Sequence, residues 1–160
     1  MAETGHERKP RILLADDDEP FLKAITIILR NAGFLVTAAT GGDHAILAHE
    51  ISLVAKEPFD LLILDIRMPG ASGWEVLKHV REHTPAGARP PRVLLTTGFT
   101  IALDLDRVKK NGADGILLKP FVLTALVKEV RRVLSIEEPA GEGHAEEARA
   151  PRREAVRRTA

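Results

Sequence analysis

The sequence predicts an α/β domain built as a doubly wound (βα)₅ chain, with a five-stranded parallel sheet between two layers of helices. Two observations lead to this prediction. Short, continuously apolar runs recur along the chain, and the segments between them carry apolar residues at helical spacing. Continuous apolarity is what strands require when both faces of a sheet are covered. Right-handed crossovers between such strands place helices on both faces.

Four of the five expected strands are runs of Ile, Leu, Val and Ala, and one is weaker. The clear runs are residues 12–15, 61–64, 93–95 and 116–118, and residues 34–38 form the weaker one. The strand order expected for this chain is 2-1-3-4-5, which is the flavodoxin-like order. In that arrangement the ligand crevice lies at the carboxyl ends of the first and third strands.

The expected helices follow from apolar residues that share one helical face and from the residues that end each helix. The first and the last have the clearest apolar faces. We expect the five helices over residues 21–29, 45–55, 74–80, 101–110 and 123–134. Gly33, Pro58 and the Asn111-Gly112 pair follow three of these segments and supply helix stops.

Composition limits the classes of function. The 160 residues include 23 basic and 23 acidic side chains, which argues against a strongly basic surface that binds nucleic acid directly. The sequence has no cysteine, which excludes disulfides, thiolate metal sites and thiol catalysis. No apolar run resembles a secretory signal or approaches the roughly 18 residues of a membrane-spanning helix. We therefore expect a cytoplasmic protein without membrane contact.

Three regions are expected along the chain. Residues 1–10 form a flexible N-terminus, residues 11–136 a folded domain, and residues 137–160 a disordered charged tail. The tail is mostly Glu, Arg, Ala, Gly and Pro, with Val156 as its only large aliphatic residue. Such a segment cannot bury enough apolar surface to offset its ordering entropy. Its two arginine pairs could contact an acidic partner, although a solvated tail is the simpler interpretation.

Polar residues stand directly after four of the expected strands. Asp16 to Asp18 follow the first strand and Asp65 the third, whereas Thr97 and Lys119 end the fourth and fifth. The carboxyl ends of parallel strands meet at the same edge of a sheet. We therefore expect these side chains, which are distant in sequence, to converge in one crevice.

Converging carboxylates repel one another unless cations compensate them. Lys119 is one such cation, and a bound Mg²⁺ or Mn²⁺ is the other, because oxygen ligands without histidine or thiolate suit these ions. A carboxylate can also act as a nucleophile and form an aspartyl-phosphate. Asp65 stands alone at a strand end and is the best candidate, while Asp16 and Asp17 are suited to hold the ion.

Four segments closely resemble the receiver domain of bacterial response regulators, of the single-domain, chemotaxis type. They are residues 12–19 (ILLADDDE), 61–70 (LLILDIRMPG), 93–98 (VLLTTG) and 112–121 (GADGILLKPF). They occur in the family's order, and the resemblance extends over about residues 11 to 135. It implies a phospho-acceptor switch that is not a conventional enzyme, although it assists its own phosphorylation and dephosphorylation. The phosphoryl donor would be a sensor histidine kinase or a phosphotransfer protein.

The resemblance implies a role for each residue of the acidic crevice. Asp65 is the phospho-acceptor and also a metal ligand. Asp17 binds the ion directly, Asp16 helps to hold it through water, and the backbone carbonyl of Arg67 completes the protein ligands. Phosphorylation then changes binding of a downstream protein partner, and a weak dimer through the fourth helix, fifth strand and fifth helix is compatible with the pattern.

The resemblance also implies the residues that sense and release the phosphoryl group. Thr97 and Lys119 bind it, and the Lys119-Pro120 peptide bond is expected to be cis. Ile116 occupies the conformational-switch position, where the family usually has Tyr or Phe, so an aromatic rotamer switch is not expected. Arg67 and Phe99 flank the path of the attacking water and would tune hydrolysis.

Two other functions compete with this interpretation. Asp16 and Asp18 could be the catalytic pair of a haloacid dehalogenase-type phosphatase, but no acidic pair follows Lys119 on a strand end, and Pro20 replaces the usual Thr or Val. A degenerate receiver could serve only as a docking surface, which the complete set of site residues argues against. Asp18 and Glu19 are interpreted as the N-terminus of a helix.

Four histidines lie on or near the second and third expected helices, namely His44, His49, His79 and His83. His79 and His83 are four residues apart, a spacing at which two imidazoles can bind one metal ion. A solvated helix face is the simpler interpretation, because no thiolate accompanies them.

Overall fold

The computed structural model describes residues 8–98 and 105–136, which fold into five strands and five helices in strict alternation. The strands are β1 (Arg11–Ala15), β2 (Leu35–Ala39), β3 (Leu61–Asp65), β4 (Arg92–Thr97) and β5 (Gly115–Leu118). The helices are α1 (Glu19–Asn31), α2 (Gly42–Val54), α3 (Gly73–His83), α4 (Leu105–Lys110) and α5 (Leu123–Leu134).

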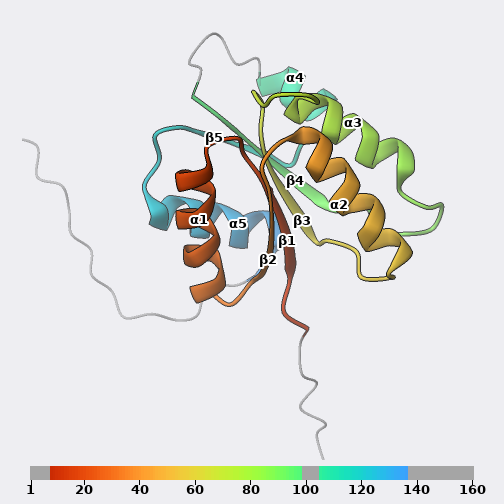
Figure 1. The fold of residues 1–160 in the computed structure, drawn as a ribbon, viewed down its shortest axis with the longest axis horizontal. Helices are drawn as coiled ribbons and strands as arrows, with labels where there is room; N and C mark the ends of the chain where they lie inside the picture. The colour runs from red at the N-terminus through yellow and green to blue at the C-terminus, as the bar shows by residue number, and fades with distance from the viewer. Residues whose placement is uncertain (1–7, 99–104, 137–160) are drawn as a thin grey trace, which may run out of the picture.

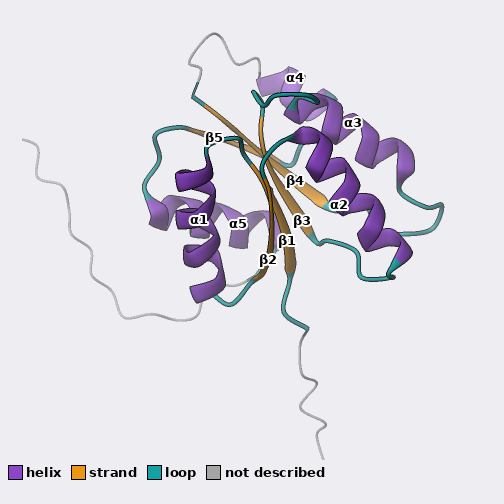
Figure 2. Cartoon of the chain, viewed as in Figure 1, coloured by secondary structure: helices purple, strands orange, loops and turns teal. Residues whose placement is uncertain are grey.

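All neighbouring strands are parallel, and their order is β2-β1-β3-β4-β5 (Figure 1). Helices α1 and α5 cover one face of the sheet, and α2, α3 and α4 lie on the other (Figure 2). The predicted fold class and strand order are thus confirmed. Within the described ranges, no helix is both long and apolar enough to cross a membrane.

Alternate residues of the central strands divide the core into two clusters. Ile12 and Leu14 of β1 pack toward α1 and α5, whereas Leu13 and Ala15 pack toward α2 and α3. Every residue of β3 is buried. Because full burial of a Leu or Ile side chain contributes about 1.5–3 kcal/mol, the strands that end at the polar crevice are held firmly in place.

Local side-chain contacts fix where two of the helices begin. The carboxylate of Asp18 accepts a hydrogen bond from the backbone N–H of Phe21 at 3.0 Å and so caps α1, as the sequence predicted. At α3, the hydroxyl of Ser72 accepts from the N–H of Glu75, and the Glu75 carboxylate accepts from the N–H of Ser72 at 2.7 Å. This reciprocal pair is a capping box.

Candidate functional site

Three carboxylates meet at the carboxyl ends of β1 and β3. Asp16, Asp17 and Asp65 each offer one oxygen, and these oxygens all lie within 4.8 Å of one another. Asp16 is 1% exposed and Asp65 9%, whereas Asp17 is exposed at the rim. The predicted convergence of sequence-distant acids is therefore present. An oxygen-only set with two buried members and one open to solvent fits Mg²⁺ or Mn²⁺, which retain water and phosphate oxygens as further ligands.

Lys119 reaches this acidic cluster from the end of β5. Its Nζ donates to Oδ2 of Asp16 at 2.5 Å and to Oδ2 of Asp65 at 3.3 Å. The Lys119-Pro120 peptide bond is cis, as the sequence predicted, and the backbone N–H of Lys119 donates to the carbonyl of Thr97 at 2.8 Å. One ammonium group thus bridges the two buried carboxylates.

An aromatic ring also contacts the lysine, and a second ring packs against the first. Nζ of Lys119 lies 4.3 Å from the ring centroid of Phe21, and Phe21 and Phe121 contact edge to face with centroids 5.9 Å apart. A cation over a ring face is attracted by the ring quadrupole. Sequence reasoning assigned Phe21 only to the apolar face of a helix. Its place in the first turn after the acidic run was the available indication that it lies at the site.

The charges of the cluster are mutually dependent. Burial raises the pKa of Asp65, and Asp16 adds to this, although Lys119 and the backbone N–H of Arg67 act in the opposite direction. Burial by itself would lower the pKa of Lys119, but hydrogen bonds and charge from Asp16 and Asp65 raise it overall. Lys119 is therefore firmly cationic, and ionised Asp65 depends on the cations around it.

The remaining predicted site residues have different surroundings in the structure. Thr97 is 3% exposed at the end of β4, where its partner in β5 is Leu118. Ile116 is partly buried and packs against the core cluster on the α2 and α3 side. Arg67 is exposed, and its backbone N–H donates to Oδ1 of Asp65 at 3.2 Å. Phe99 lies outside the described residues.

The start of α3 lies directly against the end of β3, which requires a glycine. A Cβ on Gly73 would lie 2.5 Å from the carbonyl oxygen of Asp65. The N–H of Gly73 donates to the carbonyl of Ile66 at 3.1 Å, which closes the loop between β3 and α3. This contact places the start of α3 directly against the backbone at the end of β3.

Gly73→Ala is expected to lower the free energy of unfolding by about 1–3 kcal/mol, because the new methyl group would overlap backbone atoms that cannot move independently. Urea denaturation measures this change. Gly87→Ala is an unsuitable control because φ is +82° there, whereas Gly98 has open space around it and Gly98→Ala should have little effect. Equal losses in the two variants would contradict a role for the contact.

The acidic cluster is also expected to oppose folding in the absence of metal. Removing one of three neighbouring carboxylates relieves repulsion, so metal-free Asp17→Ala should melt no lower than the parent protein. The same variant should bind Mg²⁺ much more weakly. Calorimetric melting with and without Mg²⁺ measures both effects, and a clear loss of melting temperature without metal would show that the cluster is structural instead.

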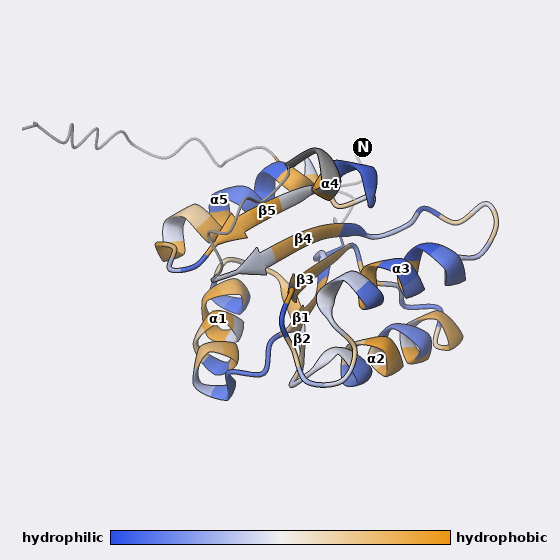
Figure 3. Ribbon diagram, turned by 90° about the horizontal axis from the view of Figure 1, so that it is seen from above, coloured by the Kyte–Doolittle hydropathy of each residue, from blue (hydrophilic) through white to orange (hydrophobic). Residues whose placement is uncertain are grey.

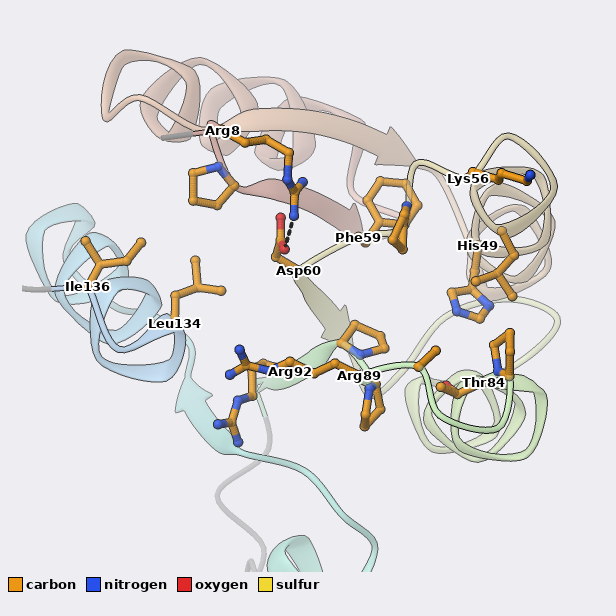
Figure 4. Close-up of a pocket in the computed structure, with 17 residues that line it drawn as sticks. Arg8, His49, Lys56, Phe59, Asp60, Thr84, Arg89, Arg92, Leu134 and Ile136 are labelled. Carbon is orange, nitrogen blue, oxygen red and sulfur yellow. Dashed lines mark hydrogen bonds and ion pairs between the residues drawn. The ribbon is translucent and has the colours of Figure 1, made fainter. Parts of the chain in front are cut away.

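A cavity of about 570 Å³ lies at the other end of the sheet (Figure 4). It is lined by residues at the amino ends of the strands, among them Pro10, Asp60 and Arg92, and the acidic residues of the crevice are not among them. The crevice at the carboxyl ends is instead marked by its three carboxylates, which suit a hydrated divalent ion.

Comparisons with known proteins agree with this geometry. A family model described as the response regulator receiver domain matches residues 12–131. The probable transcriptional regulatory protein SilR of Salmonella typhimurium is 35% identical over 126 residues, which are 78% of this chain and 50% of SilR. The DNA-binding response regulator MtrA of Mycobacterium tuberculosis is 34% identical over 134 residues, which are 82% of this chain and 54% of MtrA.

Solved structures show the same relationship. The chemotaxis protein CheY4 of Vibrio cholerae aligns with a TM-score of 0.65 at 30% identity, over 79% of this chain and 99% of CheY4. A response regulator receiver protein from Burkholderia phymatum aligns with a TM-score of 0.67 at 30% identity, over 82% and 99% of the two chains. The chain spans about half the length of the curated relatives named above. It belongs to the receiver domain family of response regulators, the phospho-acceptor switch domains of two-component systems.

Proposed function

We propose that this chain accepts a phosphoryl group on Asp65 from a histidine kinase or a phosphotransfer protein, with Mg²⁺ or Mn²⁺ bound, and that the modification changes its affinity for a downstream protein. The observation that supports this most is the acidic cluster itself. Asp16, Asp17 and Asp65 place three oxygens within 4.8 Å of one another, and Lys119 contacts the two buried members. Membership of a phospho-acceptor family supports the same assignment.

Each residue of the crevice has its own role in phosphoryl transfer. An oxygen of Asp65 attacks phosphorus as the bond from phosphorus to the donor nitrogen breaks, and the phosphoryl group becomes an acyl phosphate. The ion would be held by Asp17, Asp16, Asp65 and the Arg67 carbonyl, and when bound it would supply positive charge to the phosphoryl oxygens. Lys119 exchanges its contact with Asp65 for a phosphoryl oxygen, and the Thr97 hydroxyl donates to another.

The partners that this proposal implies are proteins. Leu118, Val122 and Leu123 expose apolar side chains along β5 and the start of α5, next to Lys119. A downstream protein, or a weak dimer through α4, β5 and α5, would cover this surface. The name of MtrA describes that relative as DNA-binding, but the balanced charge of this chain favours protein partners in the cytoplasm over nucleic acid or membrane.

Incubation with acetyl phosphate and Mg²⁺, followed by intact mass measurement, tests the proposal. We expect one added phosphoryl group per chain, and no addition in Asp65→Asn. The control is Asp60→Asn, at the opposite end of β3, which should be phosphorylated as the parent is. A phosphatase of the haloacid dehalogenase type would turn over substrate without a stable adduct, and Asp18, its second catalytic acid, instead caps α1 here. A docking-only domain would show neither adduct nor turnover.

The phosphorylated state is expected to alter the face formed by α4, β5 and α5. Thr97 and Lys119 stand at the edge of this face, and a ligand shifts an equilibrium only by its difference in interaction energy between the two states. The change should be smaller than in receivers with an aromatic residue in place of Ile116. Backbone amide shifts with and without beryllofluoride measure it, with Asp65→Asn as control. Large shifts confined to α1 would contradict the prediction.

A further inference from the structure

The first turn of α1 lies beside the segment between β5 and α5 that carries Lys119. In Figure 3, α1 and α5 lie on the same side of the sheet, and both contribute apolar residues to one core cluster. Phe21 of α1 and Phe121, just before α5, pack against that cluster half-buried, with their ring planes at 71°. The packing of these two helices therefore brings an aromatic ring to the lysine of the acidic crevice.

The backbone that carries Phe21 is held by the acidic run itself. Asp18 caps α1 by accepting from the N–H of Phe21 at 3.0 Å, and the N–H of Asp18 donates to Oδ1 of Asp16 at 2.9 Å. Pro20 restricts the same turn, because its ring fixes φ. Asp16 accepts a hydrogen bond from Lys119 through its other oxygen, Oδ2. Two hydrogen bonds therefore link a carboxylate partner of the lysine to the backbone of its aromatic partner.

The ring attracts the ammonium group in a way that does not depend on the carboxylates. Nζ of Lys119 lies over the ring of Phe21 at 4.3 Å from its centroid, within the roughly 6 Å over which the ring quadrupole attracts a cation. The Lys119 side chain is only 21% exposed, so part of its hydration is removed and the ring attracts it more strongly than at an exposed site. The ring takes no part in the reaction, so this attraction persists when the charge of Asp65 is replaced by that of a phosphoryl group.

We propose that Phe21 is a positioning residue for phosphoryl transfer, whose ring face holds the Lys119 ammonium at the crevice while it exchanges Asp65 for a phosphoryl oxygen. This inference rests on the proposed phosphorylation of Asp65, because it assigns a residue to that reaction. Phe121 contacts the Phe21 ring edge to face with centroids 5.9 Å apart, which restricts the orientation of the ring. A lysine side chain loses rotamer entropy when it is held in place. A ring that holds it beforehand lowers the reorganisation that the transition state requires.

Fluorination of the Phe21 ring separates attraction of the cation from packing. Each fluorine withdraws electron density from the ring face and so weakens its attraction for a cation, whereas the shape of the ring is nearly kept. We expect the rate at which acetyl phosphate phosphorylates the full chain at saturating Mg²⁺ to fall stepwise when Phe21 is replaced by mono-, di- and trifluorophenylalanine, by about fivefold in total. Phe21→Leu should slow it about tenfold. Intact mass measures the rate of adduct formation.

Two controls accompany the fluorinated series. Replacing Phe59 by trifluorophenylalanine is the matched control, because this buried ring lines the cavity at the other end of the sheet and lies near Arg11 instead. It should leave the rate unchanged. In Lys119→Met the ammonium group is absent, so fluorination of Phe21 should leave the residual rate unchanged as well. A parent rate that does not respond to fluorination, or equal slowing in Lys119→Met, would overturn the proposal, because the ring would then only pack.

A stability measurement tests the same contact without any phosphorylation. Urea denaturation of the parent, Phe21→Leu, Lys119→Met and the double variant, all without metal, forms a double-mutant cycle. The changes in the equilibrium constant of unfolding should be non-additive by about threefold or more, because Phe21→Leu removes the attraction only where Lys119 is present. Additive changes would overturn the proposal. If the parent itself forms no adduct, the proposed function fails, and a non-additive cycle would still support Phe21 as the residue that holds Lys119.

Discussion

Lys119→Met is expected to slow phosphorylation by acetyl phosphate about 100-fold, which corresponds to roughly 2.7 kcal/mol of barrier. The ammonium group is in place between Asp16 and Asp65 before the phosphoryl group arrives, at 2.5 and 3.3 Å from their oxygens. Such a fixed charge stabilises the transition state without reorganisation. The rate of adduct formation, measured by intact mass at saturating Mg²⁺, provides the test, and Lys128→Met on the exposed face of α5 is the control.

The same substitution should also destabilise the metal-free fold. It leaves two buried carboxylates without their cation, and breaking a buried pair costs about 3–5 kcal/mol. We expect the free energy of unfolding to fall by about 2–3 kcal/mol, which is less than for a fully buried pair. The Lys119 side chain is 21% exposed, so water screens part of the effect. Adding Asp16→Asn should restore much of the stability, because it removes one of the unpaired charges.

The pH dependence of this loss has a definite sign. The pKa of Asp65 is already raised in the folded protein by burial, and removing Lys119 raises it further. An acid with a raised folded pKa favours the folded state when protonated, and this contribution is lost as pH rises through the folded pKa. The stability gap between Lys119→Met and the parent should therefore narrow on acidification. A gap that is constant with pH, or an unchanged phosphorylation rate, would contradict the assigned role of the lysine.

The fold could be predicted because strands buried on both faces have continuous apolar sequences. β1, β3 and β4 match their predicted runs to within one or two residues at each end. β2 was the weak case, predicted over 34–38 and found at Leu35–Ala39, because it is an edge strand in which Leu35 and two other residues are exposed. Its apolar pattern is therefore interrupted. Phe34 is buried just before the strand, so the predicted range begins one residue too early.

The start of α2 could not be read from the sequence for a tertiary reason. The helix begins at Gly42, three residues before the predicted Ala45, and no side chain caps it. A Cβ at Gly42 would lie 1.8 Å from the carbonyl oxygen of Ala71, so the glycine is required by the loop that follows β3. A glycine pair normally indicates a turn, and only the folded structure shows that the second glycine here is helical.

The acidic crevice was predictable because a topological rule places the carboxyl ends of parallel strands together. The sequence and that rule together predict one shared sheet edge for Asp16, Asp17, Asp65 and Lys119. No comparable rule places side chains where two helices pack. The contacts of Phe21 with Lys119, and of His49 with His79, depend on helix rotation and crossing, which periodicity does not specify.

The phosphoryl group on Asp65 is expected to decay slowly, with a lifetime of many minutes or longer. In receivers the residues two past the acceptor and two past the threonine flank the approach of the attacking water, and here they are Arg67 and Phe99. A small amide or a carboxylate at these positions would orient water, which a phenylalanine ring cannot do. The Arg67 backbone N–H already contacts Asp65, and its side chain is suited to hold a phosphoryl oxygen.

The double substitution Arg67→Asn with Phe99→Glu should shorten that lifetime about tenfold or more, equivalent to roughly 1.4 kcal/mol of barrier. Phosphate loss is followed by intact mass after the donor is removed, at constant Mg²⁺. Arg89→Asn is a suitable control, because Arg89 lines the cavity at the other end of the sheet and should leave the decay unchanged. Two results would contradict this prediction: a parent lifetime of seconds, or a double variant that decays no faster. Either would show that these two side chains do not control how water reaches the acyl phosphate.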